Sequence, residues 1–149
     1  MSFESNYYET QYKKLLKKFS REMKNNSTTY ASELHKMGSG ISPRFRGIYP
    51  SDRVPTLKDG DSLIFNVDTH EEPGSHWVSL AKQGPHLYFY DSFGRSPKEL
   101  VPQANGVNEF LYDKTDSEQK IHETDCGQRC LAWLALGHTY GFNTILDDI

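Results

Sequence analysis

The chain has 149 residues, of which 36% are hydrophobic and 13% aromatic, and its formal net charge is −3 at pH 7. This length fits one domain of ordinary size and excludes a multidomain enzyme. The small net charge gives no overall attraction to nucleic acid or to an anionic membrane. The charge is uneven, however, because residues 1–24 carry six basic and three acidic side chains.

The N-terminal segment, residues 1–26, predicts an amphipathic helix over 8–24. Apolar side chains recur there at helical spacing, at Tyr8, Tyr12, Leu15, Leu16, Phe19 and Met23. The intervening positions include the basic residues Lys13, Lys14, Lys17, Lys18 and Arg21. Two interpretations of this basic face remain open: a solvated surface, or a docking face on which these residues bind the phosphates of a nucleic acid.

A second short helix is expected after Ser27-Thr28-Thr29, whose hydroxyls can cap its first turn, and Gly38-Ser39-Gly40 predicts its end. Three prolines follow between residues 41 and 60. Because proline lacks the N–H that helices and central strands need, this stretch is expected to be an ordered loop or an edge segment.

The middle of the chain has the pattern of strands. Segments 62–67, 76–81 and 86–91 are rich in aromatic and β-branched residues and are separated by turn residues, which predicts an antiparallel meander. Residues 96–111 are compatible with a helix, although Pro102 and Asn105-Gly106 disfavour it.

The last predicted element is a helix over 126–140, which is apolar around its whole circumference and is bounded by Gly141. A helix of this kind is expected to be buried. The elements together predict one α+β domain over residues 1–149, with its core in 41–140.

The two cysteines, Cys126 and Cys130, are four residues apart at the start of this helix. Helical spacing makes a disulfide between them unfavourable. With no signal-peptide pattern and no apolar run near 18 residues, we expect a reducing, intracellular setting and no membrane partner. The cysteines must then be core residues, metal ligands or catalytic groups, and the spacing of His and Cys provides no tetrahedral metal set.

Cys126 is the best candidate nucleophile. It follows a polar turn ending in Asp125 and begins the buried helix, where free N–H groups and the helix dipole favour a thiolate. Gly127 would allow a substrate to approach the backbone, so Asp125 and Gly127 are candidate residues of a substrate cleft. The alternative is that Cys126 is a small core residue.

Three further residues supply the groups that a cysteine protease needs. His76 begins a strand and can accept and return a proton, while Asp91, at the end of another strand, can bind its second ring nitrogen. The Gln119 amide can donate to an oxyanion. Trp77 can shield the imidazole in the cleft. Each of these residues also has an ordinary structural interpretation. His76 could be a surface or core histidine, Asp91 a turn residue, Gln119 a solvated side chain and Trp77 a core residue.

In combination, these residues resemble the adenovirus-protease-like (adenain) cysteine proteases, in the clan shared with the SUMO- and ubiquitin-like-specific proteases. The matching signatures extend over residues 41–136 and are Phe65-Asn66, Gly74-x-His76-Trp77, Asp91-x-Phe93-Gly94, Gln119 and Cys126-Gly127-x-x-Cys130. The adenovirus enzymes carry Glu where this chain has Asp91, whereas the SUMO-protease relatives carry Asp. Residues 44–55 also look like a loop of adenain-like proteins from virophages and large DNA transposons.

The resemblance implies a papain-like architecture, with a central mixed or antiparallel sheet and a buried helix beginning at the nucleophile. It implies a triad of Cys126, His76 and Asp91, with Gln119 at the oxyanion hole and Cys130 packing one helical turn below Cys126. It further implies an endopeptidase, expected to be a monomer, that cleaves near glycine and needs no cofactor, although DNA could activate it.

Two protein substrates fit this resemblance. Capsid or other structural precursors, cut during maturation by a protease packaged in the virion, are favoured because the chain is short and its histidine motif is close to the viral type. The first alternative is an isopeptidase that acts on the Gly-Gly tails of SUMO or ubiquitin. The second is a catalytically inactive module that binds nucleic acid or protein.

Overall fold

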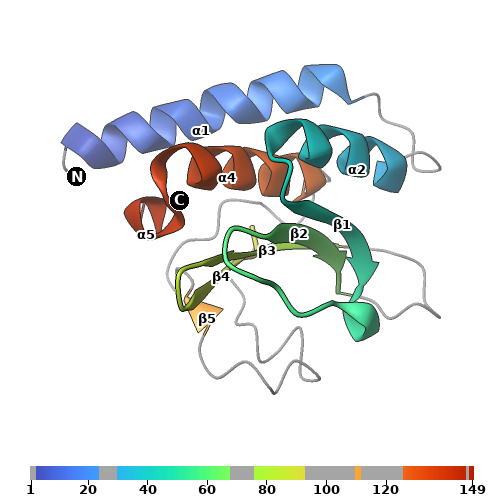
Figure 1. The fold of residues 1–149 in the computed structure, drawn as a ribbon. Coiled ribbons are helices and arrows are strands. Elements are labelled where there is room, and N and C mark those ends of the chain that lie inside the picture. Colours follow the sequence, from blue (N-terminus) through green and yellow to red (C-terminus); the bar gives the residue numbers. More distant parts are fainter. Residues whose placement is uncertain (1–2, 24–29, 68–75, 93–109, 112–125, 147) are drawn as a thin grey trace.

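The computed structural model describes residues 3–23, 30–67, 76–92, 110–111, 126–146 and 148–149. These residues form a sheet with helices on one of its faces, an α+β arrangement as predicted (Figure 1). The elements, in chain order, are α1 (Phe3–Glu22), α2 (Tyr30–Ile41), β1 (Phe45–Pro50), a 3-10 turn (Ser51–Arg53), β2 (Ser62–Asn66), β3 (Trp77–Gln83), β4 (His86–Tyr90), β5 (Phe110–Leu111), α4 (Cys126–Tyr140) and α5 (Phe142–Ile145).

The sheet has the strand order β1-β2-β3-β4-β5 and is mixed. Its centre, β2-β3-β4, is the predicted antiparallel meander, with Ile64 opposite Ser79 and Ser79 opposite Tyr90. β1 and β5 are added on either side by parallel pairing. The edge segment predicted within 41–60 is therefore confirmed as β1. The helix predicted over 96–111 is wrong at residues 110–111, which form β5, and its remainder lies outside the described residues.

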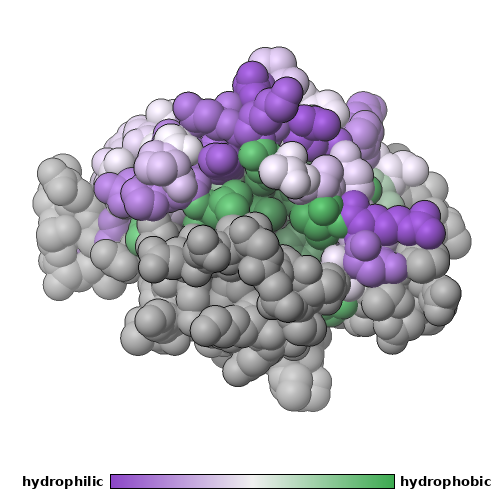
Figure 2. Space-filling model, turned by 60° about the horizontal axis from the view of Figure 1, so that its bottom comes forward, coloured by the Kyte–Doolittle hydropathy of each residue, from purple (hydrophilic) through white to green (hydrophobic). Residues whose placement is uncertain are grey.

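Alternation along the strands divides the apolar residues between two cores. Even-numbered positions on β2 and β4, such as Ile64, Tyr88 and Tyr90, face the helices, as does the odd-numbered Ala81 of β3. They form the helix-side core with residues of α1, α2 and α4. Odd-numbered positions on β2 and β4 and even-numbered ones on β3 form the far-side core together with Leu57, which precedes β2; the strand residues of this core are Leu63, Phe65, Val78, Leu80 and Phe89. Figure 2, turned toward the side away from α1, shows apolar residues bordered by hydrophilic ones in the described surface.

α4 occupies the centre of the helix layer, with the bounds that the sequence predicts. It packs against β3 on one side and against α1 and α2 on others. These contacts account for its apolar composition, and ten of its fifteen residues are buried. The contact between α4 and β3 places the first residue of α4, Cys126, beside the sheet.

α1 covers α4 with the apolar face that the periodicity predicts. Tyr12, Phe19 and Met23 are buried, while Lys17 and Arg21 are exposed. The helix begins earlier than the predicted residue 8 and ends at Glu22, and residues 24–29 lie outside the described part of the chain. No helix in the described ranges combines the length and the apolar character needed to cross a membrane.

The end predicted for the second helix at Gly38-Ser39-Gly40 is wrong, because α2 continues through these residues to Ile41. Gly38 is instead a packing residue: a Cβ atom at this position would overlap the ring of Phe45, which begins β1. A glycine in a helical pattern thus permits close approach between α2 and the sheet rather than a chain reversal.

The two glycines of α2 give a matched test of this packing. Gly38→Ala should destabilise the fold by roughly 1–3 kcal/mol, because the buried ring of Phe45 must move. Gly40→Ala should stabilise it by about 0.5–1 kcal/mol, since nothing lies within 4 Å of its Cβ position and alanine is the better helix former. Urea unfolding of both variants measures this difference. Equal free energies of unfolding would contradict the packing argument.

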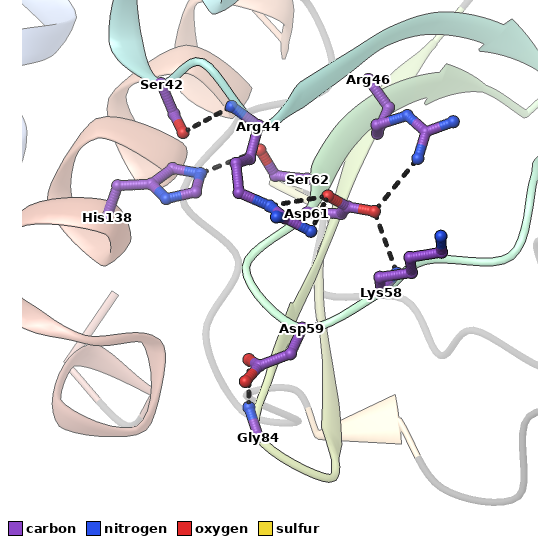
Figure 3. A network of polar contacts seen from close by, with 9 residues as sticks. All are labelled: Ser42, Arg44, Arg46, Lys58, Asp59, Asp61, Ser62, Gly84 and His138. Atoms are coloured by element: carbon purple, nitrogen blue, oxygen red, sulfur yellow. Dashed lines mark hydrogen bonds and ion pairs between the residues drawn. The ribbon is translucent and has the colours of Figure 1, made fainter.

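A buried carboxylate next to β2 forms ion pairs with two arginines at the start of β1 (Figure 3). Asp61 is 2% exposed, and its Oδ1 lies 2.7 Å from Arg44 Nη2 while its Oδ2 lies 3.2 Å from Arg46 Nη1. Its Oδ2 also accepts the Lys58 N–H at 2.9 Å. Burial by itself raises the pKa of Asp61, but the Lys58 N–H and the two guanidinium groups outweigh it, so the pKa is lowered.

A lowered pKa makes this contribution to stability dependent on pH. It is present above the unfolded-state pKa, about 3.9, and is lost as the pH falls through the folded-state value. Asp61→Asn should therefore lower the free energy of unfolding by about 1–2 kcal/mol at pH 7, since the arginines are half exposed and screened. The difference from the parent should narrow below about pH 4. Thermal unfolding across this pH range measures it.

Asp59→Asn is the control for this prediction, because the exposed Asp59 accepts the Gly84 N–H at 2.7 Å and an amide oxygen can replace that acceptor. Its effect should be small at every pH. A difference between parent and Asp61→Asn that persists unchanged in acid would show that the charge of Asp61 is not what stabilises the pairing of β1 with β2.

Candidate active site

His76 lies immediately before β3, where the backbone holds it beside the end of β2. Its carbonyl oxygen accepts a hydrogen bond from the Val67 N–H at 3.0 Å. The residue is 6% exposed. The sequence predicts a histidine at the start of a strand. In the structure, His76 directly precedes β3, and its imidazole is buried at one end of the sheet.

Asp91 follows the last residue of β4 at the same end. Because β3 and β4 are antiparallel and pair Ser79 with Tyr90, the start of β3 and the end of β4 lie side by side. His76 Nε2 is 2.6 Å from Asp91 Oδ1, and the two side chains are 8% and 0% exposed. A hydrogen bond this short between a buried carboxylate and an imidazole fixes the orientation of the ring.

Cys126, the first residue of α4, reaches the same place from the helix layer. It is 6% exposed, and its side chain is a hydrogen-bond partner of His76. Since Nε2 of His76 binds Asp91, Nδ1 is the ring nitrogen left for the thiol. The first N–H groups of a helix have no partner within the helix, so they and the helix dipole favour a negative charge at this position.

These neighbours determine how His76 titrates. Burial lowers the pKa of its imidazole, but the hydrogen bonds and charges of Asp91 and Cys126 outweigh burial, and the net effect raises the pKa above 6.5. The imidazolium form therefore persists to higher pH than in a free histidine. Such a ring can hold the proton of Cys126 and release it later.

Cys130 lies one helical turn further along α4 and has a different environment. It is fully buried in the helix-side core. Burial, together with the charges of Cys126 and Asp91, raises the pKa of its thiol well above the usual value. A protonated, inaccessible thiol is a packing group, in agreement with the role expected for Cys130.

The remaining predicted residues differ in burial, and two of them lie outside the described part of the chain. Trp77 is half-buried and packs against the helix-side core, and Gly127 is buried. Gln119 and Asp125 lie outside the described residues. The basic residues of α1 are exposed, and they are Lys13, Lys14, Lys17, Lys18 and Arg21.

Three buried polar residues lie beside the predicted ones; Asn66 belongs to the signature Phe65-Asn66 named above, and the sequence interpretation missed the other two. Ser92 and Gln128 are 1% and 5% exposed and lie next to Asp91 and near Cys126 in the chain. Asn66, 4% exposed, pairs with Trp77 across the sheet. The burial of Ser92 and Gln128 could not be predicted from residue type, because polar residues at strand ends and in first helical turns are usually solvated.

The sequence matches no protein-family model and no curated protein. In the described ranges, no three His, Cys, Asp or Glu side chains are grouped so that they could hold a metal ion.

Proposed function

We propose that this protein is a cysteine endopeptidase with a papain-like architecture of the adenain type, in which Cys126 is the nucleophile. The observation that carries the proposal is the convergence of Cys126 and Asp91 on His76, with 2.6 Å between His76 Nε2 and Asp91 Oδ1. A nucleophile, a base and a group that orients the base are the set required for covalent catalysis. The order of these residues in the chain, His, Asp and Cys, agrees with the resemblance to adenain.

The reaction begins when the Cys126 thiol transfers its proton to His76 and the thiolate attacks a peptide carbonyl carbon. A C–S bond forms, and the carbonyl oxygen becomes an oxyanion. His76 then gives its proton to the amide nitrogen as the C–N bond breaks, which releases the amine and leaves a thioester on Cys126. Water, deprotonated by His76, attacks the thioester, and the C–S bond breaks to release the acid and regenerate the thiol.

Asp91 remains ionised through this cycle and stabilises the imidazolium form of His76. The oxyanion would be stabilised by the Cys126 backbone N–H at the start of α4, together with the amide of Gln119 as the resemblance implies. Trp77, the half-buried residue that follows His76, would limit access of water to the ring.

The proposed substrate is a protein cut near glycine, as the resemblance to adenain implies; a narrow cleft would explain this preference, because larger side chains close to the scissile bond would clash. Structural precursors of a DNA virus or related element are the favoured class, on the similarity of the histidine motif to the viral type. Conjugates in which the Gly-Gly tail of SUMO or ubiquitin is joined to a target are the alternative that an assay must separate from it.

A library of glycine-containing peptides tests the proposal, with Cys126→Ala as the control protein. We expect cleavage at a restricted set of glycine sites by the parent and none by the variant. A capsid-type precursor and a SUMO conjugate are then compared at equal concentration. Efficient release of SUMO would replace the viral substrate with the modifier, while cleavage that persists in Cys126→Ala would refute the enzyme assignment.

A further inference from the structure

Asp91 lies just beyond the regular pairing of the sheet. The last paired residues of β3 and β4 are Ser79 and Tyr90, and β5 pairs with β4 at Leu87 and Tyr88. The orientation of Asp91 therefore depends strongly on how firmly Tyr90, the preceding residue, is held.

Tyr90 is held from two sides by the helix layer. Its ring stacks on Trp133 of α4, with ring centroids 5.4 Å apart and planes 14° apart. Its hydroxyl lies 2.7 Å from the hydroxyl of Tyr12 on α1, and both tyrosines are buried, at 5% and 3% exposed. The N-terminal helix thus contacts the residue adjacent to Asp91 although it lies far away in the sequence.

We propose that Tyr12 is a positioning residue, which fixes the end of β4 through its hydroxyl bond to Tyr90 and thereby holds Asp91 against His76. This inference rests on the proposed function of the triad. It makes α1 a part of the catalytic unit through its buried face, whether or not its basic face binds any partner.

The angular preference of the hydrogen bond between Tyr12 and Tyr90 distinguishes positioning from ordinary packing. A hydrogen bond in a buried, low-dielectric environment is strongly directional, whereas ring packing tolerates small rotations. Phenylalanine at position 12 would keep the ring but lose the bond, so the end of β4 could shift by a fraction of an ångström. Shifts of this size in a catalytic group can reduce turnover substantially.

α1 offers a closely matched control. The hydroxyl of Tyr7 lies 2.8 Å from that of Tyr140, the last residue of α4, in an exposed pair. Tyr7→Phe and Tyr12→Phe therefore each remove one hydroxyl of α1 from one hydroxyl pair. Only the Tyr12 pair involves the neighbour of Asp91.

The experiment compares both variants with the parent in two measurements. We expect kcat/KM on a cleaved glycine peptide to fall about tenfold in Tyr12→Phe, through kcat rather than KM, and to stay near the parent value in Tyr7→Phe. The pKa of the His76 imidazole, followed by NMR of its ring C–H, should fall in Tyr12→Phe and stay at the parent value in Tyr7→Phe. Tyr90→Phe, which removes the same bond from the other side, should behave like Tyr12→Phe.

The NMR titration separates this inference from the proposed function, because it needs no turnover. Parent protein that cleaves nothing would count against the protease, while the His76 titration would still test the positioning. An unchanged His76 pKa in both Tyr12→Phe and Tyr90→Phe, or equal changes in Tyr12→Phe and Tyr7→Phe, would overturn the positioning role.

Discussion

Replacing Cys126 with alanine should reduce peptide cleavage by at least about 10³-fold while leaving the fold intact. No other described cysteine can take over, because Cys130 is fully buried and its thiol is held protonated. Initial rates on the best peptide from the glycine library, with thermal unfolding of the same preparations, measure the loss of activity and the integrity of the fold.

Cys130→Ala is the matched control, since it removes the neighbouring thiol of the same helix. It leaves a small cavity in the helix-side core, so we expect a loss of stability of about 1–2 kcal/mol and an activity within a fewfold of the parent. Mass spectrometry after brief treatment with iodoacetamide should find the label on Cys126 and not on Cys130. Preferential labelling of Cys130, or equal activity losses in the two variants, would be incompatible with Cys126 as the nucleophile.

Asp91→Asn should lower kcat/KM by roughly 10²- to 10⁴-fold, because the amide cannot stabilise the imidazolium of His76 and favours the wrong tautomer. Asparagine keeps the size of the buried side chain, so gross unfolding is not expected. The pH profile of kcat/KM gives the decisive readout. Its alkaline limb reports the loss of the proton from His76 and should lie above pH 6.5 in the parent.

The sign of this shift follows from the surroundings of His76. Asp91 and Cys126 raise the pKa of the imidazole, so removing the charge of Asp91 should move the alkaline limb to lower pH. For the same reason, His76 adds stability to the parent below its unfolded-state pKa, about 6.5, and this contribution is lost as the pH rises through the folded-state value. An alkaline limb that stays in place in Asp91→Asn would remove Asp91 from the mechanism.

The central sheet and α4 could be predicted from the sequence because their hydrophobic patterns are strong and local. Alternation over 62–67, 76–81 and 86–91 and the apolar run from Leu131 to Leu136 each correspond to one type of element. The end of α2 could not be predicted, since the reason for Gly38 is the ring of Phe45, a contact made by the folded chain. Local signals carry no information about which close approaches a glycine permits.

The candidate site shows the same division. His76, Asp91 and Cys126 could be selected because each occupies the end of a predicted element and together they resemble a known family. The role of Tyr12 could not, because in the sequence it is one apolar position of an amphipathic helix, and its hydroxyl partner is 78 residues away. Likewise, the burial of Ser92, Gln128 and Asn66 depends on the surrounding tertiary structure and has no counterpart in residue type.

The hairpin of β3 and β4 has a consequence for the order in which the site assembles during folding. His76 and Asp91 are brought together by one turn, so they can meet through local chain closure, which is fast. Cys126 joins them only when α4 docks on β3. The contact between α1 and α4 joins two helices that lie near opposite ends of the sequence. We therefore expect the acid–base pair to form early and the reactive thiol to be completed late, so that partly folded chains have a histidine–aspartate pair but no protease activity.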